Sequence, residues 1–282
     1  MTLTQREQDE IAAANASGHL PVVFVHGLWL LAGSWDAWRR LFEERGYATI
    51  APGWPDDPDT VPDALAHPEV FAGKSIGRVT DHYAEAIGRL TRKPIVIGHS
   101  FGGMITQKLA GMGLALGAVA IDPAPFRGVK PLPLSALKAA SPALKKPGNR
   151  KRAVPLNYEQ FRFAFANAVP EAEARQLYDS YSVPGPGLPL FQAAFANFNP
   201  GTEASVDTKR ADRGPLLIID GEKDNTVPWS IANASYKRYK HATAPTEIVK
   251  ILGRGHSLTI DSGWQEVAEI ALKFLDDQGL RP

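Results

Sequence analysis

The chain has 282 residues, enough for one large α/β domain or for two smaller domains. Its 31 Lys and Arg residues nearly balance 30 Asp and Glu residues, so it lacks the basic excess of a nucleic-acid-binding domain. Hydrophobic residues make up 44% of the chain, which excludes wholesale disorder. The absence of cysteine excludes disulfides, thiolate metal sites and thiol nucleophiles.

The N-terminal 18 residues lack the basic start and apolar core of a secretory signal. No apolar run approaches the roughly 18 residues that are needed to cross a bilayer. We therefore expect a cytoplasmic protein without stable membrane insertion. The residue pattern does not define an oligomeric state.

Short apolar runs alternate with longer amphipathic segments, a pattern typical of a mostly parallel sheet with helices on both faces. Several runs are almost continuous in Val, Ile and Leu, as expected for strands that are buried on both faces. We predict an α/β fold with about six strands, at residues 21–25, 48–52, 94–98, 117–122, 215–220 and 247–252.

The segments between these runs have the spacing of helices. Residues 1–18 are predicted to form a polar helix, and Ser34 is expected to cap a second helix that ends at Gly46. Apolar residues at three- and four-residue steps predict further helices over 76–90 and 264–275.

The alternation stops between residues 127 and 213, where Pro, Gly and aromatic residues are frequent and no strong strand pattern occurs. We interpret this segment as a helical cap over the edge of the sheet, inserted between core segments 1–126 and 214–282. A mobile, solvated hinge is the favoured interpretation of its basic stretch, and attraction of an anionic substrate or a membrane surface is the alternative. The stretch contains Lys145, Lys146, Arg150, Lys151 and Arg152.

Residues 98–102 form a G-x-S-x-G motif between a predicted strand and a helix-like segment. Such a strand–turn–helix junction requires small flanking residues and raises the Ser100 hydroxyl above the sheet. The N-terminus of the following helix favours the negative charge that develops in acyl transfer. Ser100 is therefore the predicted nucleophile.

A serine hydroxyl needs a base within hydrogen-bonding reach. His256 follows the last predicted strand in a glycine-containing loop, so we predict that it is the base. His26 lies in a loop after an earlier strand, and His99 lies inside the motif, where its side chain is expected to pack or to orient neighbours. Surface positions are expected for His67, His82 and His241.

The base in turn needs an acid to hold its tautomer. Asp224 follows a predicted strand in a loop at the same edge of the sheet and is the favoured acid. Asp122, at the end of another strand, is the alternative acid, and Asp220 is expected to brace the turn. The oxyanion requires two backbone N–H donors, which we assign to Phe101 and Leu28, with Trp29 the less favoured choice for the second.

Four motifs, in order, resemble the α/β-hydrolase superfamily: HGLW, GHSFGG, GEKDNTVP and GRGHSL. The resemblance implies a mostly parallel sheet whose strand ends carry Ser100, Asp224 and His256, with a lid or cap inserted after the sixth strand of the family. It also implies two strands before HGLW, where this chain has a predicted helix. Relatives that open epoxides or displace halide have Asp in place of Ser100, and HGLW lacks the HGGG run of one lipase and esterase group.

Together these features predict a serine hydrolase that cleaves a small apolar carboxylic ester without a cofactor or metal, and with no nucleic-acid partner. The acidic loop with Asp56, Asp57, Asp59 and Asp63 is expected to be solvated. Amide, lactone or C–C bond hydrolysis and perhydrolysis use the same triad and stay open. A hydroxynitrile-type lyase and a non-catalytic receptor are less favoured. The residues predicted to line the substrate pocket are His26, Trp29, Phe161, Phe165, Phe195 and Phe198, although the cap aromatics could instead form the core of the cap.

Overall fold

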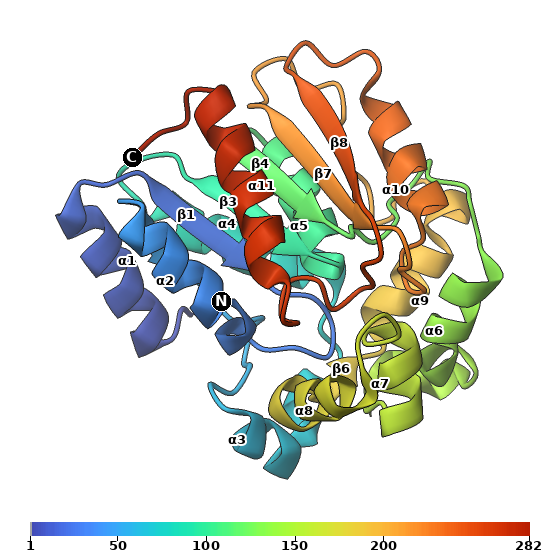
Figure 1. The fold of residues 1–282 in the computed structure, drawn as a ribbon. Coiled ribbons are helices and arrows are strands. Elements are labelled where there is room, and N and C mark those ends of the chain that lie inside the picture. The colour runs from blue at the N-terminus through green and yellow to red at the C-terminus, as the bar shows by residue number, and fades with distance from the viewer. Residues whose placement is uncertain (1) are drawn as a thin grey trace.

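A parallel six-stranded sheet with helices on both faces forms the centre of the computed structural model, which describes residues 2–282 (Figure 1). The strand order is β2-β1-β3-β4-β7-β8. The predicted fold class is therefore confirmed. The strands of this sheet are β1 (Pro21–Val25), β2 (Ala48–Ile50), β3 (Ile95–His99), β4 (Gly117–Ile121), β7 (Leu216–Gly221) and β8 (Thr246–Ile251).

Helices connect the strands and are the main regular elements of the segment between β4 and β7. The α-helices are α1 (Gln5–Ser17), α2 (Asp36–Glu44), α3 (Val61–Ala66), α4 (Ile76–Gly88), α5 (Phe101–Gly111), α6 (Leu134–Leu144), α7 (Tyr158–Ala164), α8 (Glu171–Tyr181), α9 (Leu188–Ala194), α10 (Trp229–Tyr236) and α11 (Trp264–Asp277). Short 3-10 helices are η1 (Ala32–Trp35), η2 (Pro68–Phe71), η3 (Pro147–Lys151), η4 (Ala196–Phe198) and η5 (Lys237–Tyr239).

Hydrophobic cores lie on both faces of the sheet, as the side-chain alternation of β1 shows. Val22 and Phe24 pack with α2 and α11 on one face, whereas Val23 and Val25 pack with α4 and α5 on the other. All five residues of β1 are buried, which explains the continuous apolar run in the sequence. The second of these cores continues through Phe161 into the segment between β4 and β7, for which we keep the name cap.

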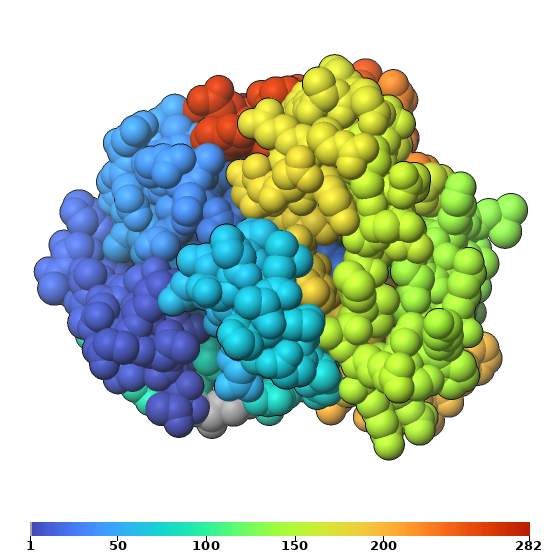
Figure 2. Space-filling view, turned by 90° about the horizontal axis from the view of Figure 1, so that it is seen from below, coloured from blue at the N-terminus to red at the C-terminus, as the bar shows by residue number. Residues whose placement is uncertain are grey.

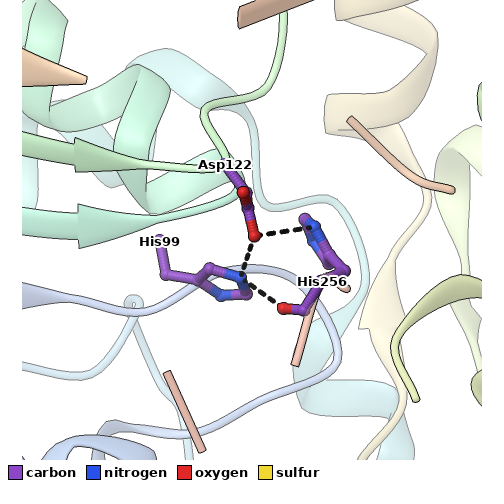
Figure 3. Close-up of side chains that lie close together, drawn as sticks. All are labelled: His99, Asp122 and His256. Atoms are coloured by element: carbon purple, nitrogen blue, oxygen red, sulfur yellow. Dashed lines mark hydrogen bonds and ion pairs between the residues drawn. The ribbon is translucent and has the colours of Figure 1, made fainter. Parts of the chain in front are cut away.

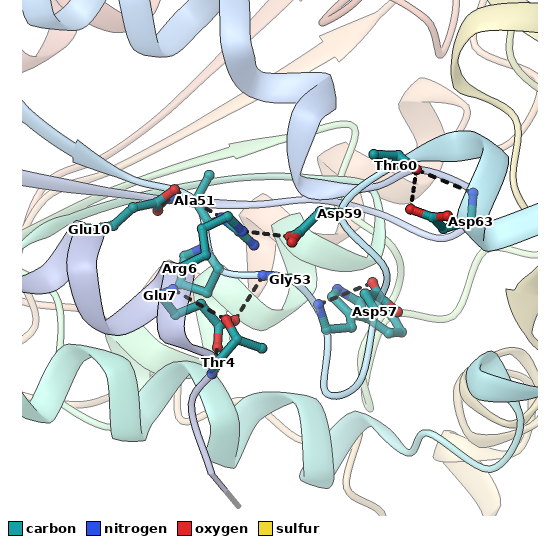
Figure 4. Close-up of polar contacts among 12 residues, drawn as sticks. Thr4, Arg6, Glu7, Glu10, Ala51, Gly53, Asp57, Asp59, Thr60 and Asp63 are labelled. Atoms are coloured by element: carbon teal, nitrogen blue, oxygen red, sulfur yellow. Dashed lines mark hydrogen bonds and ion pairs between the residues drawn. The ribbon is translucent and has the colours of Figure 1, made fainter. Parts of the chain in front are cut away.

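Helix α1 occupies the region before β1 where the family resemblance implies strands. Thr4 and Glu7 form a capping box at its start. The carboxylate of Glu7 accepts a hydrogen bond from Gly53 N at 3.1 Å, and that of Glu10 accepts one from Ala51 N at 3.0 Å (Figure 4). These bonds fasten α1 to the chain that leaves β2.

The segment between β4 and β7 contains α6 to α9 and a small antiparallel ribbon of β5 (Ala153–Val154) and β6 (Gly185–Pro186). In Figure 2 this segment, coloured from lime to yellow, meets the cyan segment around residues 60–75, and the surface is hollowed between them. The hollow is lined by Ala72, Gly73, Arg150, Lys151 and Leu188.

One helix start differs from the prediction. Ser34 lies within η1, and its hydroxyl donates to Leu31 O at 2.7 Å, so Ser34 does not cap α2. Trp35 is the residue before α2, because Ser34, which the sequence pattern assigned to the N-cap position, belongs to the preceding 3-10 helix. Within residues 2–282, no helix is both long enough and apolar enough to span a lipid bilayer.

Candidate active site

Ser100 stands between β3 and α5 with a φ of 57° and a ψ of −120°, a strained conformation for a residue with a side chain. The turn depends on the flanking glycines. A Cβ on Gly98 would lie 2.3 Å from Gly102 O, and a Cβ on Gly102 would lie 2.0 Å from Val25 O. The G-x-S-x-G spacing thus follows from backbone packing, and it places Ser100 at the N-terminus of α5.

The loop after β1 packs directly against this turn. A Cβ on Gly27 would lie 2.8 Å from the Cβ of Ser100, so only glycine allows the close approach of the two loops. Trp29 has a φ of 64°, and its indole N–H donates to Val154 O at 2.8 Å. The loop that contains the proposed donor Leu28 therefore packs against the turn at Ser100 and is hydrogen-bonded to the β5–β6 ribbon.

His256 and Asp224 are joined by a short hydrogen bond, in which Nδ1 of His256 lies 2.6 Å from Oδ2 of Asp224. Both side chains are fully buried. The other carboxylate oxygen of Asp224 accepts hydrogen bonds from Thr226 N at 2.6 Å and from Val227 N at 2.8 Å. These donors stabilise a negative charge on Asp224 and orient it toward the imidazole.

Asp122 lies close to the same imidazole, with Oδ2 at 3.7 Å from His256 Nδ1, beyond hydrogen-bonding distance (Figure 3). Its other oxygen accepts a hydrogen bond from Gly221 N at 2.9 Å. Burial and the neighbouring Asp224 and Asp220 carboxylates raise the pKa of Asp122 well above its usual value. Burial and the neighbouring carboxylates therefore favour the neutral form of Asp122.

Asp220, at the end of β7, completes a cluster of three buried carboxyl groups. Burial and the charge of Asp224 raise the pKa of Asp220 to about 9. The oxygens of Asp122, Asp220 and Asp224 lie within 4.8 Å of one another, a spacing that could suit a cation. The raised pKa values of Asp122 and Asp220 favour their neutral forms, which lowers the repulsion among the three groups.

His99 lies next to His256 and contacts its backbone. Its Nε2 donates to His256 O at 2.9 Å, and the two rings are 4.6 Å apart (Figure 3). Burial and the nearby His256 lower the pKa of His99 well below its usual value, so His99 is neutral and supports the His256 loop. Among the described residues, Nε2 of His256 has no hydrogen-bond partner. A bond between a nucleophile and its base commonly tightens only in the substrate complex.

One predicted histidine environment, that of His82, is wrong. His82 is buried rather than on the surface, with its Nε2 2.9 Å from the Glu7 carboxylate. His26 is also buried, and its Nε2 lies 3.2 Å from Oδ2 of Asp57, which in turn pairs with the buried Lys74. His67 and His241 are exposed, as expected.

Three carboxylates of the acidic loop, Asp56, Asp59 and Asp63, are exposed to solvent as predicted, and only the Asp57 side chain is buried. Asp57 contacts Lys74, Asp56 pairs with Arg78 at 2.5 Å, and Asp59 pairs with Arg6 at 2.6 Å. The side chain of Asp63 accepts a hydrogen bond from the Thr60 hydroxyl at 2.6 Å at the start of α3 (Figure 4). These carboxylates hold the loop in place next to α1 and α4.

A cavity of about 490 Å³ opens beside Ser100 and extends beneath the cap. Ser100, Phe101, Trp29 and Phe198 lie in its wall. The cavity is mostly apolar and is within the size range of sites for small organic ligands. Further wall residues are Ala124, Pro125, Phe126, Val129, Lys130, Leu132, Ala136, Ala139, Ala140, Leu190, Ala193, Val227 and Ile231.

Four of the predicted pocket residues lie outside this wall. Phe161 and Phe165 stack on each other with ring centres 5.0 Å apart, and Phe165 contacts the His256 ring edge-on at 4.9 Å. Phe161 and Phe165 thus join the cap to the loop of His256. His26 is held by Asp57. Phe195 projects into solvent and is 59% exposed.

Alanines of α6 and α9 line the cavity, and no such role was predicted for them. Ala136, Ala139 and Ala140 occur at three- and four-residue steps, and this spacing of small residues in the cap could have indicated a helix face that leaves space. Lys130, the basic residue in the cavity wall, was also missed.

Residues 22–270 match the alpha/beta hydrolase family, so the chain belongs to this family. Among curated proteins, none matches the chain. Similar solved structures include a monoacylglycerol lipase from Paleococcus ferrophilus, with 19% identity, a TM-score of 0.61 and coverage of 92% of this chain and 94% of that chain. A bromoperoxidase from Bacillus anthracis has 18% identity, a TM-score of 0.65 and 92% coverage of both chains. A methylesterase from Arabidopsis has 16% identity, a TM-score of 0.63 and coverage of 91% and 99%. At these identities the likeness shows a shared fold.

Proposed function

We propose that the protein is a serine hydrolase that cleaves a carboxylic ester through an acyl-enzyme on Ser100. The observation that carries the proposal is the convergence at one sheet edge of a strained Ser100, a buried His256–Asp224 pair 2.6 Å apart, and an apolar cavity with Ser100 in its wall. The lipase and methylesterase with the same fold favour an ester among possible acyl substrates.

In the first half of the reaction, Nε2 of His256 takes the proton of the Ser100 hydroxyl as Oγ bonds to the ester carbonyl carbon. The N–H groups of Leu28 and Phe101 bind the resulting oxyanion. Collapse of this intermediate breaks the ester C–O bond, and His256 returns the proton to the leaving alcohol. Asp224 stabilises the imidazolium while it carries the proton.

In the second half, His256 removes a proton from water as the hydroxide oxygen bonds to the acyl carbon. The second oxyanion collapses, the bond to Ser100 Oγ breaks, and His256 returns the proton to Ser100. Hydrogen peroxide in place of water would give a peracid, so perhydrolysis requires the same residues and belongs in the test.

The test is a series of p-nitrophenyl esters from acetate to decanoate, assayed with the wild type and the Ser100→Ala variant. We expect turnover by the wild type, labelling of Ser100 by a fluorophosphonate, and loss of both in Ser100→Ala. The exposed Ser205→Ala variant is the matched control and should behave as the wild type. Folded wild-type protein that neither turns over any ester nor becomes labelled would refute the proposal, and parallel amide, lactone and peroxide assays define the preferred acyl chemistry.

A further inference from the structure

The cap differs in charge from the rest of the chain. Between Asp122 and Glu159 there is no acidic residue, although this stretch contains eight Lys and Arg residues. The rest of the chain then holds 23 basic and 30 acidic residues, so a net charge near zero conceals one positive segment of the cap in an otherwise negative chain. All eight side chains are exposed: Arg127, Lys130, Lys138, Lys145, Lys146, Arg150, Lys151 and Arg152. We call residues 123–158 the basic segment.

Exposed apolar side chains concentrate in the same part of the molecule. Of the nine large hydrophobic side chains that are exposed in the described chain, five belong to the cap. Three of these five also line the opening of the cavity beside Ser100. We call the group the mouth patch, and it consists of Leu132, Leu134, Leu137, Phe195 and Phe198.

Hydrogen bonds join the two segments that carry the mouth patch. The side chain of Asn197 accepts from Gly128 N at 2.7 Å and donates to Val129 O at 2.9 Å. Leu132 and Phe198 therefore project from adjoining loops with 68% and 83% exposure. Apolar groups that are exposed together at this level are a mark of an interaction surface.

The mouth patch and the most basic turn lie at opposite ends of helix α6. Leu134 begins the helix, and Lys145 follows its last residue. Eleven helical residues span roughly 16 Å. The side chain of Asn149 holds the basic turn against the end of α6 through bonds to Pro142 O and Ala143 O. Apolar and cationic groups thus lie at the two ends of one helix, close enough for both to contact the same lipid surface.

We propose that the mouth patch and the basic segment together dock the cap onto an anionic lipid surface. Apolar side chains enter the boundary between headgroups and acyl chains, while Lys and Arg attract anionic headgroups. A single small anionic substrate does not explain the arrangement, because only Lys130 among the eight basic residues lines the cavity. If the proposed hydrolase function also holds, docking would present the cavity opening to lipid esters.

The test measures binding separately from catalysis. The Ser100→Ala variant is incubated with sucrose-loaded vesicles, which are then sedimented. One set of vesicles is pure phosphatidylcholine, and the other contains about 30% of the anionic lipid phosphatidylglycerol. We expect preferential sedimentation with the anionic vesicles that weakens in high salt. Adding Lys145→Glu/Lys146→Glu should lower the partition coefficient by about tenfold or more. Leu134→Asp/Phe195→Asp should also reduce it, since neither residue lines the cavity.

Matched controls place the same changes on the core. Lys93→Glu/Lys240→Glu reverses two exposed charges outside the cap, and Leu65→Asp/Leu252→Asp changes two exposed apolar residues outside it. These variants should bind vesicles as the parent does. Absence of binding to anionic vesicles, or equal losses in cap and control variants, would overturn the docking proposal. Ester turnover by the wild type is scored separately with soluble substrates, so the two proposals can fail independently.

Discussion

The ends of the central strands and the cap contribute to the same cavity but are built differently. Asp224 is held by two backbone donors and His256, and Ser100 is held by glycines that tolerate no added carbon atom. The cap contributes alanines to the cavity wall and exposed apolar residues at its opening. Under the proposed function, the core supplies the groups that attack the substrate, and the cap shapes the space that the substrate enters.

The largest expected effect tests whether Asp224 alone, and not Asp122, orients the His256 imidazole for the proposed reaction. Asp224→Asn should lower kcat/KM by about 10⁴-fold, because the amide favours the wrong imidazole tautomer. Asp122→Asn should cost less than about tenfold, because Asp122 lies 3.7 Å from the imidazole and its surroundings favour the neutral carboxyl group. Steady-state kinetics on the best ester measures both. Similar losses in the two variants would show that the carboxyl groups act as one unit.

The next effect concerns the buried Glu7–His82 pair, which belongs to the core and is remote from the cap. Burial tends to raise the pKa of Glu7, but hydrogen bonds from His82 and Thr4 outweigh it, and the net pKa is lowered. Glu7 therefore stabilises the fold above its unfolded-state pKa, and this contribution is lost as the pH falls through its folded-state pKa. Glu7→Gln should lower the free energy of unfolding at pH 7 by about 3 kcal/mol.

Urea denaturation at pH 7 and at pH 3 to 4 measures the Glu7 effect, with the exposed Glu44→Gln as control. The gap between wild type and Glu7→Gln should narrow in acid. If the difference in the free energy of unfolding does not change with pH, packing of the Glu7 side chain rather than its charge stabilises α1.

A smaller effect on stability is expected at Asp220. Its pKa of about 9 exceeds the unfolded-state value, so the folded state retains a proton that the unfolded state loses, and stability falls as the pH rises from 4 toward 9. Asp220→Asn removes this titration. From pH 5 to pH 8, the free energy of unfolding of the variant should therefore rise by at least about 1 kcal/mol relative to that of the wild type. Denaturation curves at both pH values check this. The exposed Asp179→Asn should show no such gain, and a matching gain there would contradict the assignment.

The smallest effect addresses the cap. Ala193→Phe adds a ring to the cavity wall and should lower kcat/KM for decanoyl esters by roughly tenfold, a size typical of steric discrimination in an apolar pocket. Acetyl esters should be affected much less. The exposed Ala172→Phe on α8 is the matched control. Equal loss on short and long esters would place the cavity outside the acyl-binding path.

The features that the sequence predicted well are those that depend on local patterns. Continuous apolar runs located all six strands, and G-x-S-x-G located the strained turn at Ser100 because the flanking glycines are required by the immediate backbone. The burial of His82 was not predictable in this way, since its partner Glu7 lies 75 residues earlier.

The cap residues show the same limit. The i, i+4 spacing of Phe161 and Phe165 places both rings on one helix face, but only the tertiary structure shows that this face meets His256 and Trp29. The exposure of Phe195 likewise depends on how α9 and η4 meet the loop at Val129. Helix packing was the missing information.

Helix α1 has a consequence for association between copies of the chain. β2 is an edge strand, and unpaired backbone groups at such an edge can recruit a strand from another molecule. The N–H groups of Ala51 and Gly53, just beyond β2, already donate to Glu10 and Glu7, and Arg6 donates to Ala51 O. Charged side chains of α1 therefore saturate the backbone beyond β2 without extending the sheet, which makes this helix a guard against edge-to-edge aggregation.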